Sequence, residues 1–210
     1  MPIVTIRGQL GSRAPEIGKK AAELLHADYV DREIIAEVAA RLQRDEQDVI
    51  AKEMPPSGLL GRIAEALDRG IPFGAGIEGA YLPAWEIPLD DRRYRQALES
   101  VILELARSQS LVIRGRGSQF ILKKHPHTLH VLTVAPLEAR LKRVMEERKI
   151  DEEAARREIA HFDNASREFI KRYYQAAWED PVQYDLVVNT ENLSFEVAAS
   201  IIIQALSVKA

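Results

Sequence analysis

Three residues near the start of the sequence, Gly8, Gly11 and Ser12, have the types and spacing of a loop that binds phosphate. They follow the β-branched run Ile3–Ile6, and a helical spacing of apolar residues begins at Ile17. A loop between a strand and a helix N-terminus directs free backbone N–H groups at an anion. The stretch therefore predicts a strand, a phosphate-binding loop and a helix. A plain tight turn built from the same residues is an equally open interpretation.

The complete phosphate-binding motif, G-x-x-x-x-G-K-[ST], also contains a second glycine, a lysine for the β- and γ-phosphates and a hydroxyl for Mg²⁺. Gly8 fits the first glycine of this motif. The other three positions are occupied by Arg13, Ala14 and Pro15. Because Arg13 is the cation nearest to the missing lysine, we predict that it replaces the lysine if phosphoryl transfer occurs.

Two further arginines, Arg114 and Arg116, directly follow the apolar run Leu111–Ile113. Open α/β sheets bind ligands at the carboxyl ends of their strands. A guanidinium at such an end can bind two phosphate oxygens at once. We predict that Arg116 binds a ligand, whereas Arg114 pairs with a nearby carboxylate.

A third group of cations, Arg167, Lys171 and Arg172, is spaced at about one helical turn, so the three can share one helix face. Such a face could close over a phosphate as a charged lid. A solvated helix face is the alternative.

Three histidines, His125, His127 and His130, lie close together in the sequence. No cysteine is available, and no carboxylate is interleaved among them. We therefore expect no protein metal site here, because structural zinc sites need four such ligands.

The elements that would position these residues alternate between strands and helices, which predicts an α/β fold with a parallel sheet covered on both faces. The expected strands are Ile3–Ile6, Leu111–Ile113, His130–Val134 and Leu186–Val188, with a short extended piece at Asp28–Arg32. The expected helices are one ending at Leu25, then Glu33–Leu42, Asp45–Lys52, one from Asp90 to about Arg107, a short one ending at Leu122, one from Pro136, Asp151–Phe162 and Phe195–Leu206.

The segment Met54–Leu89 is rich in proline and glycine and has little regular spacing. Long irregular segments in compact domains are often binding loops. We interpret residues 54–92 as an insertion on the acceptor side, and an excursion without a ligand role is equally open.

The composition fits one intracellular domain. The 210 residues are 46% hydrophobic, and 29 basic against 32 acidic residues give a formal net charge of −3. That balance offers no general attraction to nucleic acid or an anionic membrane. The chain has no cysteine, no basic and apolar leader and no apolar run long enough to span a bilayer. We expect a cytoplasmic protein.

Taken together, the segments resemble the cytidylate-kinase-like branch of the P-loop nucleoside monophosphate kinases over nearly the whole chain. The resemblance depends on the order and spacing of the segments, because no single one is specific. They are VTIRGQLGS, EIGKKAAELL, DYVDREII, PLDDRRYRQALESVILELA, LVIRGRGSQFIL, APLEARLKRVMEER and DPVQYDLVVNTENLSFEVAASII.

The resemblance implies a three-layer α/β/α P-loop kinase-like fold, a single domain over residues 1–210 and a mobile lid within 138–180. It also implies transfer of the γ-phosphoryl group of ATP, with Mg²⁺, to a nucleoside monophosphate or similar small acceptor. On this resemblance Gly8, Gly11 and Ser12 bind the donor phosphates. Asp31, Arg95 and Arg116 serve the acceptor, and Arg167 and Arg172 act from the lid.

The chain departs from the family in its loop and at Gly117, where the true kinases have an aspartate. The lid also has a less dense Arg/Asp run, with Phe162, Ala165 and Ser166 in its place. Two hypotheses follow. The protein is either an active small-molecule kinase that uses Arg13, or a catalytically weak or inactive nucleotide-binding and regulatory protein.

Overall fold

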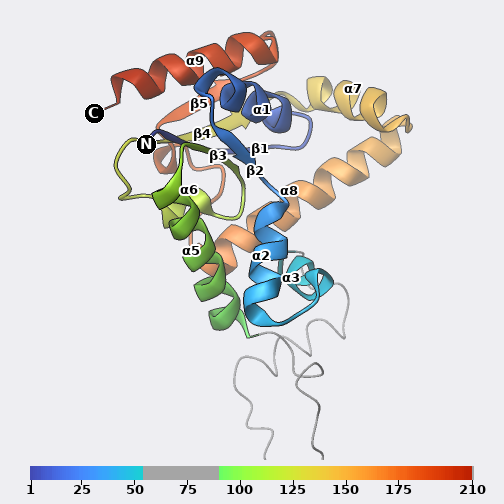
Figure 1. Cartoon of the computed structure of the whole chain (residues 1–210). Coiled ribbons are helices and arrows are strands. Elements are labelled where there is room, and N and C mark those ends of the chain that lie inside the picture. Colours follow the sequence, from blue (N-terminus) through green and yellow to red (C-terminus); the bar gives the residue numbers. More distant parts are fainter. Residues whose placement is uncertain (54–89, 210) are drawn as a thin grey trace, which may run out of the picture.

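The computed structural model describes residues 1–53 and 90–209 and is built around a parallel sheet of five strands (Figure 1). The strands lie in the order β2-β3-β1-β4-β5, and every neighbouring pair is parallel. Their bounds are β1 Ile3–Gly8, β2 Asp28–Val30, β3 Leu111–Arg114, β4 Thr128–Val134 and β5 Leu186–Asn189. The predicted α/β fold with a parallel sheet is therefore confirmed, and the extended piece after Ala27 forms the edge strand β2.

The helices follow the strands along the chain. Their bounds are α1 Ala14–Leu25, α2 Glu33–Leu42, α3 Glu46–Glu53, α5 Asp91–Ser108, α6 Ser118–Ile121, α7 Leu137–Arg148, α8 Glu152–Tyr174 and α9 Phe195–Val208, with a 3₁₀ turn at Pro181–Gln183. The N-cap residues of α5, α8 and α9 are Asp90, Asp151 and Ser194. The side chain of each accepts a hydrogen bond from a backbone N–H of the first turn. Such caps satisfy donors that a helix start leaves without a partner.

Strand residues alternate between two hydrophobic cores, so both faces of the sheet are covered. In β3, Leu111 and Ile113 face one core, and Val112 faces the other. Helices α1 and α9 cover the face of Val112, and α2 and α5 cover the opposite face (Figure 1). This arrangement gives the three layers of an α/β/α fold.

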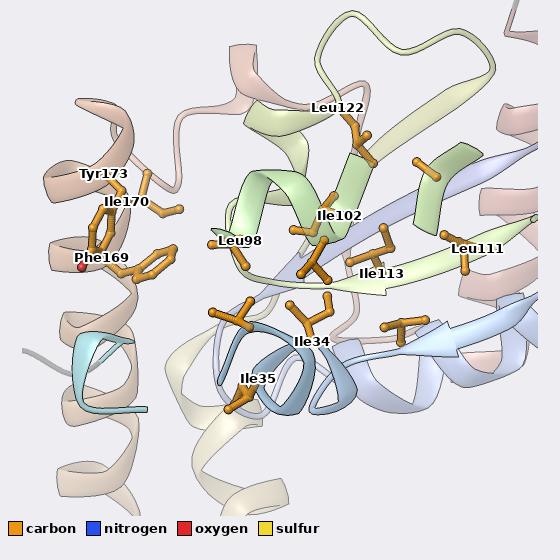
Figure 2. Close-up of a cluster of buried hydrophobic side chains, with 14 of the residues drawn as sticks. Ile34, Ile35, Leu98, Ile102, Leu111, Ile113, Leu122, Phe169, Ile170 and Tyr173 are labelled. Atoms are coloured by element: carbon orange, nitrogen blue, oxygen red, sulfur yellow. The ribbon is translucent and has the colours of Figure 1, made fainter. Parts of the chain in front are cut away.

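The core under α2 and α5 extends to the lid region. Figure 2 shows Phe169, Ile170 and Tyr173 of α8 beside the side chains that α5 and β3 contribute, including Leu98 and Ile113. Helix α8 is thereby anchored at its C-terminal half by buried aromatic and aliphatic contacts. In its N-terminal half, α8 packs on α7 through a separate small cluster around Leu141 and Ile159.

Two expectations about elements need correction, and a third falls almost wholly outside the described residues. The segments 151–162 and 163–174 form one continuous helix, α8, because Ala155, Ile159, Ser166 and Ile170 keep one buried stripe across the expected break. The helical spacing of apolar residues that begins at Ile17 includes Leu24, but this side chain is 43% exposed, because α1 turns this side away from the sheet. The expected insertion 54–92 lies outside the described residues except for 90–92, which cap and begin α5.

Candidate functional site

The loop between β1 and α1 contains two residues with a left-handed backbone conformation, Gly11 and Arg13, and one tightly packed glycine, Gly8. Gly11 has φ +81°, and Arg13 has φ 63° and ψ 23°. Arg13 thus keeps the backbone conformation that glycine adopts most easily, at the position of the missing motif glycine. A Cβ on Gly8 would lie 2.1 Å from Thr133 Oγ1 and 2.4 Å from Ser12 Oγ, so only glycine fits there.

Several loop amides already donate to protein acceptors. The Gln9 amide donates to the Thr133 carbonyl at 3.2 Å, and the Ser12 amide donates to the Gln9 carbonyl at 3.0 Å. The Leu10 amide donates to Asp163 Oδ1 at 3.2 Å. Pro15 has no N–H to offer. Among the described residues, no acceptor is found for the amides of Gly11, Arg13, Ala14 and Glu16, which are therefore the donors left for a ligand.

Ser12 does not face a ligand in this conformation. Its side chain is fully buried, and its hydroxyl donates to the Gln9 carbonyl at 2.6 Å and shares a hydrogen bond with Thr133 Oγ1 at 2.7 Å. The Ser12 carbonyl accepts from Thr190 Oγ1 at 3.1 Å. In this conformation Ser12 holds the loop against β4 and the turn after β5, and its phosphate contact stays a prediction.

Two arginines of α7 and one carboxylate of α8 clamp the loop from outside. Arg140 pairs with Asp163 at 2.6 Å and reaches the Leu10 carbonyl at 3.4 Å. Arg143 donates to the Gly11 carbonyl at 3.1 Å and to the Thr190 carbonyl at 2.6 Å. Burial of Arg143 lowers its pKa, and the neighbouring Arg13 guanidinium lowers it further. The loop is thus held rigidly from two helices.

A large cleft of about 870 Å³ opens above this loop. Its lining includes the loop itself from Gly8 to Glu16 with the exception of Ser12, together with α7 and α8 residues. Seven arginine and lysine side chains line it against three glutamates; the cations are Arg13, Lys19, Arg32, Arg114, Arg143, Arg148 and Arg157. Its size falls in the range of small-molecule sites, and its charge favours an anionic ligand.

The cleft fits the triphosphate of ATP better than it fits a dedicated metal site. The free amides of Gly11 and Arg13, the N-terminus of α1 and the surrounding cations are all suited to phosphate oxygens. Of the three glutamates in the lining, Glu147 and Glu158 each lie within 4 Å of Arg148 Nε, whereas no ion pair between Glu16 and another described residue is found. Mg²⁺ commonly uses one or two carboxylates together with substrate phosphates, so Glu16 is the residue that would hold it.

A smaller cavity of about 160 Å³ adjoins the cleft. Its lining includes Arg7, Arg114 and Arg116 together with Phe162 and Phe169 of α8. Gly8, Arg114 and Phe162 line both cavities, so the two spaces meet at the end of β1. This edge of the sheet is where parallel strands present their carboxyl ends to ligands.

The two predicted residues Arg116 and Asp31 belong to one ion-pair network beside this cavity. Arg114 pairs with Asp31 at 2.8 Å, as expected for a surface arginine next to a carboxylate. Arg116 Nε lies 2.7 Å from Glu53 Oε1, and Arg116 Nη1 lies 3.9 Å from Asp31 Oδ1. Asp31 thus holds Arg114 directly, and Glu53 is the carboxylate in close contact with Arg116. Asp31 is absent from the lining of the cavity.

Glu53 is a buried carboxyl group within this network. Burial raises its pKa above the usual value, although the Arg116 guanidinium and a 3.3 Å hydrogen bond from Tyr94 act in the opposite direction. Glu53 also lines the small cavity. It closes α3, and the sequence pattern gave no sign that it would reach Arg116.

Three predicted site residues lie away from both cavities. Arg95 pairs with Glu99 at 3.2 Å and donates to the Tyr173 carbonyl at 3.3 Å, so the expected convergence with Arg116 is not found. Arg167 is exposed and bonds Asn164 of its own helix. Arg172 pairs with Asp91 at the start of α5. In this conformation none of the three side chains lines either cavity.

Gly117, where the resemblance led us to expect an aspartate, is tightly packed against α8. It has φ +67°, and a Cβ there would lie 2.1 Å from Tyr174 Cε2. Tyr174 stacks on Phe120 with ring centroids 4.8 Å apart, and its hydroxyl donates to the Arg116 carbonyl at 3.3 Å. An aromatic ring of α8 therefore fills the space into which a side chain at position 117 would extend.

The histidines do not gather around a common centre. His130 is buried, and its Nδ1 lies 2.8 Å from Thr5 Oγ1. His125 lies near Thr128, and His127 sits exposed in a left-handed turn. Within residues 1–53 and 90–209, no three His, Cys, Asp or Glu side chains are grouped as a metal site requires.

The most important residue that sequence reasoning missed is Arg7. It directly precedes Gly8 at the end of β1, and a charged residue at the end of a buried strand was the available signal. Asp163 and Arg143 were missed as well, because their contacts with the loop join segments more than 130 residues apart.

Comparisons with known proteins agree with this architecture. The family described as cytidylate kinase-like matches residues 3–192 of the chain. A cytidylate kinase of Staphylothermus marinus is 29% identical over 120 residues, which cover 57% of this chain and 62% of the kinase. A 31% identical stretch of 93 residues, 44% of this chain, matches 18% of a uronate isomerase of Corynebacterium glutamicum. The chain thus spans less than two thirds of the length of these curated relatives.

Solved structures share the fold at low sequence identity. A crystal structure of an uncharacterized protein from Eubacterium ventriosum has a TM-score of 0.70 with 19% identity, and the match covers all of both chains. Shikimate kinase from Bacteroides thetaiotaomicron has a TM-score of 0.51 with 12% identity, and the match covers 99% of each chain. In the part of the chain that the structure describes, no helix has the length and apolar character needed to cross a membrane.

Proposed function

We propose that this chain, which belongs to the cytidylate kinase-like family, binds a nucleoside triphosphate in the large cleft and a small acceptor in the adjoining cavity. The observation behind this proposal is that Gly8, Arg114 and Phe162 line both spaces. Phosphoryl transfer depends above all on holding donor and acceptor in contact and in line. Two ligands in these cavities would meet at the end of β1.

On the donor side, the chain supplies backbone donors and cations. The free amides of Gly11 and Arg13 and the N-terminus of α1 would bind phosphate oxygens, and the Arg13 side chain would neutralise their charge. ATP would supply the phosphoryl group, with Mg²⁺ held by Glu16 and the phosphates. On the acceptor side, Arg116 is the predicted anchor, and Glu53 lies 2.7 Å from its Nε.

We expect transfer to be slow. Ala14 provides no cation, Pro15 provides neither a hydroxyl nor an N–H, and the Ser12 hydroxyl is buried in hydrogen bonds to the protein. Loss of one oriented donor to a transition state typically costs about 10²–10³ in rate. Two such losses leave little efficient catalysis unless Arg13 compensates.

A catalytically silent nucleotide-binding protein is the second candidate, and Asp163 favours it. This carboxylate accepts the Leu10 amide at 3.2 Å and pairs with Arg140 at 2.6 Å. A loop amide that a phosphate would otherwise use is thereby occupied by a negative group. Such a contact stabilises the loop but opposes a phosphate at the same amide.

The deciding experiment measures Mg²⁺-dependent consumption of ATP by the unmodified protein against a panel of nucleoside monophosphates and small hydroxy acids, with ATP binding measured in parallel. Turnover of roughly 1–100 per second, the ordinary range for kinases, that Arg13→Ala abolishes would establish an active kinase with Arg13 as the substitute cation. ATP binding without turnover would support the silent protein. Absence of ATP binding would refute both. Arg107→Ala, at an exposed arginine of α5, is the control.

A gain-of-function variant separates the two candidates further. Arg13→Gly combined with Ala14→Lys restores the glycine and lysine of the complete motif, and both positions line the cleft. A change from no turnover to turnover would support the silent protein, because it shows that only the loop chemistry was missing. No change in a variant that folds and binds ATP would show that the Asp163 clamp or the acceptor side also limits transfer.

A further inference from the structure

The wall of the small cavity contains a cation, Arg7, that forms no ion pair within the described part of the chain. Arg7 is largely buried, lines the cavity and forms no hydrogen bond or ion pair with any described residue. Its Nε is buried without an acceptor. The guanidinium lies 5.4 Å from the ring of Trp178, a contact that supports a cation but does not neutralise it.

The neighbouring charges are already compensated. Arg114 has Asp31 at 2.8 Å, and Arg116 has Glu53 at 2.7 Å. Arg7 therefore contributes the unbalanced positive charge of this cavity. Buried charges in proteins are paired with an opposite charge or bound to a ligand, because an isolated one is strongly destabilising.

The cavity limits what can neutralise Arg7. Its volume of about 160 Å³ is well below the roughly 300–1,000 Å³ of sites for drug-sized ligands. Phe162, Ala165 and Phe169 contribute apolar surface to the same lining. The space therefore suits an oxyanion with a few attached carbon atoms. A nucleoside would have to extend outside it.

We propose that Arg7 binds the oxyanion of the acceptor, a phosphate or a carboxylate, so that the acceptor is a small molecule whose anionic end enters the cavity first. The proposal deepens the function proposed above by naming the chemical class of the acceptor. It makes Arg7 a binding residue of the cavity in addition to Arg116. The paired arginines shape the site, and Arg7 provides the net charge that attracts the ligand.

Trp178 provides a local probe for the test. The sequence contains two tryptophans, so Trp85→Phe leaves Trp178 as the sole one, beside Arg7. In this background, inorganic phosphate and acetate are titrated separately while tryptophan fluorescence is recorded. We expect saturable binding of at least one anion, and Arg7→Met should weaken it by at least tenfold. Arg107→Met, at an exposed arginine, should leave it unchanged.

A second readout separates ligand binding from packing. Without ligand, Arg7→Met should melt at the same temperature as its parent or a few degrees higher, because it removes an unpaired buried charge. Unchanged anion affinity in Arg7→Met, or no binding of either anion by the parent, would overturn the proposal. The preferred anion identifies phosphate or carboxylate as the natural group. ATP binding is measured independently. If the protein binds phosphate through Arg7 but does not bind ATP, the proposed function is refuted while the proposal for Arg7 stands.

Discussion

At the residue scale, Arg13 occupies a backbone conformation that its side chain does not favour. Its φ of 63° is left-handed, and a residue with a Cβ pays about 1–2 kcal/mol for it relative to the usual helical region. The chain keeps this conformation because Gly11 and Ser12 direct the backbone into α1. The arginine therefore places a cation in the cleft at some expense of stability, as residues of binding loops often do.

Replacing Arg13 by glycine should stabilise the fold while removing the cation. We expect the free energy of unfolding of Arg13→Gly to rise by about 0.5–1 kcal/mol, since strain is relieved but the unfolded chain gains freedom. Repulsion with the Arg143 guanidinium is also removed. Urea unfolding measures the change. Arg93→Gly, in α5, is the control, and we expect its free energy of unfolding to fall by about 1 kcal/mol. A fall in the free energy of unfolding of Arg13→Gly as well would contradict the inference that Arg13 is strained.

At the scale of elements, α8 contacts each part of the site. Its Asp163 holds Leu10 of the loop, its Phe162 lines both cavities, and its Tyr174 packs on the turn at Gly117. The helix is continuous over 23 residues and anchored in the core by Phe169 and Tyr173. Any motion of the predicted lid region would therefore change the loop, the cleft and the acceptor cavity together.

The packing of α8 on the β3–α6 turn can be tested with two glycines. Gly115 and Gly117 both have left-handed φ, but a Cβ on Gly115 meets only Arg7 Nη1 at 3.8 Å, whereas one on Gly117 would overlap the Tyr174 ring. We expect Gly115→Ala to cost about 1–2 kcal/mol of unfolding free energy from backbone strain alone. Gly117→Ala should cost about 1–3 kcal/mol more because of overpacking. Equal losses in chemical denaturation would show that Tyr174 can move aside freely.

At the scale of the whole molecule, the loop after β1 lies at one edge of the sheet, and a cluster of titratable side chains lies toward the opposite edge. His130 of β4 is buried against Thr5, its amide donates to Asp185, and Asp185 pairs with Lys209 after α9. Burial lowers the pKa of His130 to about 4, although Asp185 raises it and Lys209 and Lys123 lower it further. The folded protein therefore holds this imidazole neutral at pH values where the unfolded chain protonates it.

Stability should consequently fall as the medium becomes acidic. An unfolded histidine has a pKa near 6.5, so the unfolded state binds the extra proton between about pH 6.5 and 4. Full stability is expected above pH 6.5, with a loss of up to about 3 kcal/mol by pH 4 from this group. Urea unfolding at several pH values measures it. In His130→Gln the free energy of unfolding should change less with pH between about pH 6.5 and 4. An unchanged pH dependence in this variant would assign the effect to other groups.

What the sequence alone determined was local and periodic. The strands around Ile3, Leu111 and Leu186 and the caps at Asp90 and Ser194 follow from apolar period and side-chain hydrogen bonding within a few residues. The family resemblance and the parallel α/β fold followed from the order of these segments. The incomplete loop was also readable, since Arg13, Ala14 and Pro15 stand at fixed positions of a motif.

What only the tertiary structure decided was which charged side chains face each other. Helical spacing grouped Arg167 with Arg172, yet α8 directs Arg172 to Asp91 and leaves Arg167 in solvent. Nothing local marks Arg7 as a cation that forms no ion pair with another described residue, because its pairing depends on what β3, α3 and α8 bring to the end of β1. Electrostatic pairing acts over a few ångströms between segments far apart in the chain, so it is fixed only once the sheet and helices have been packed.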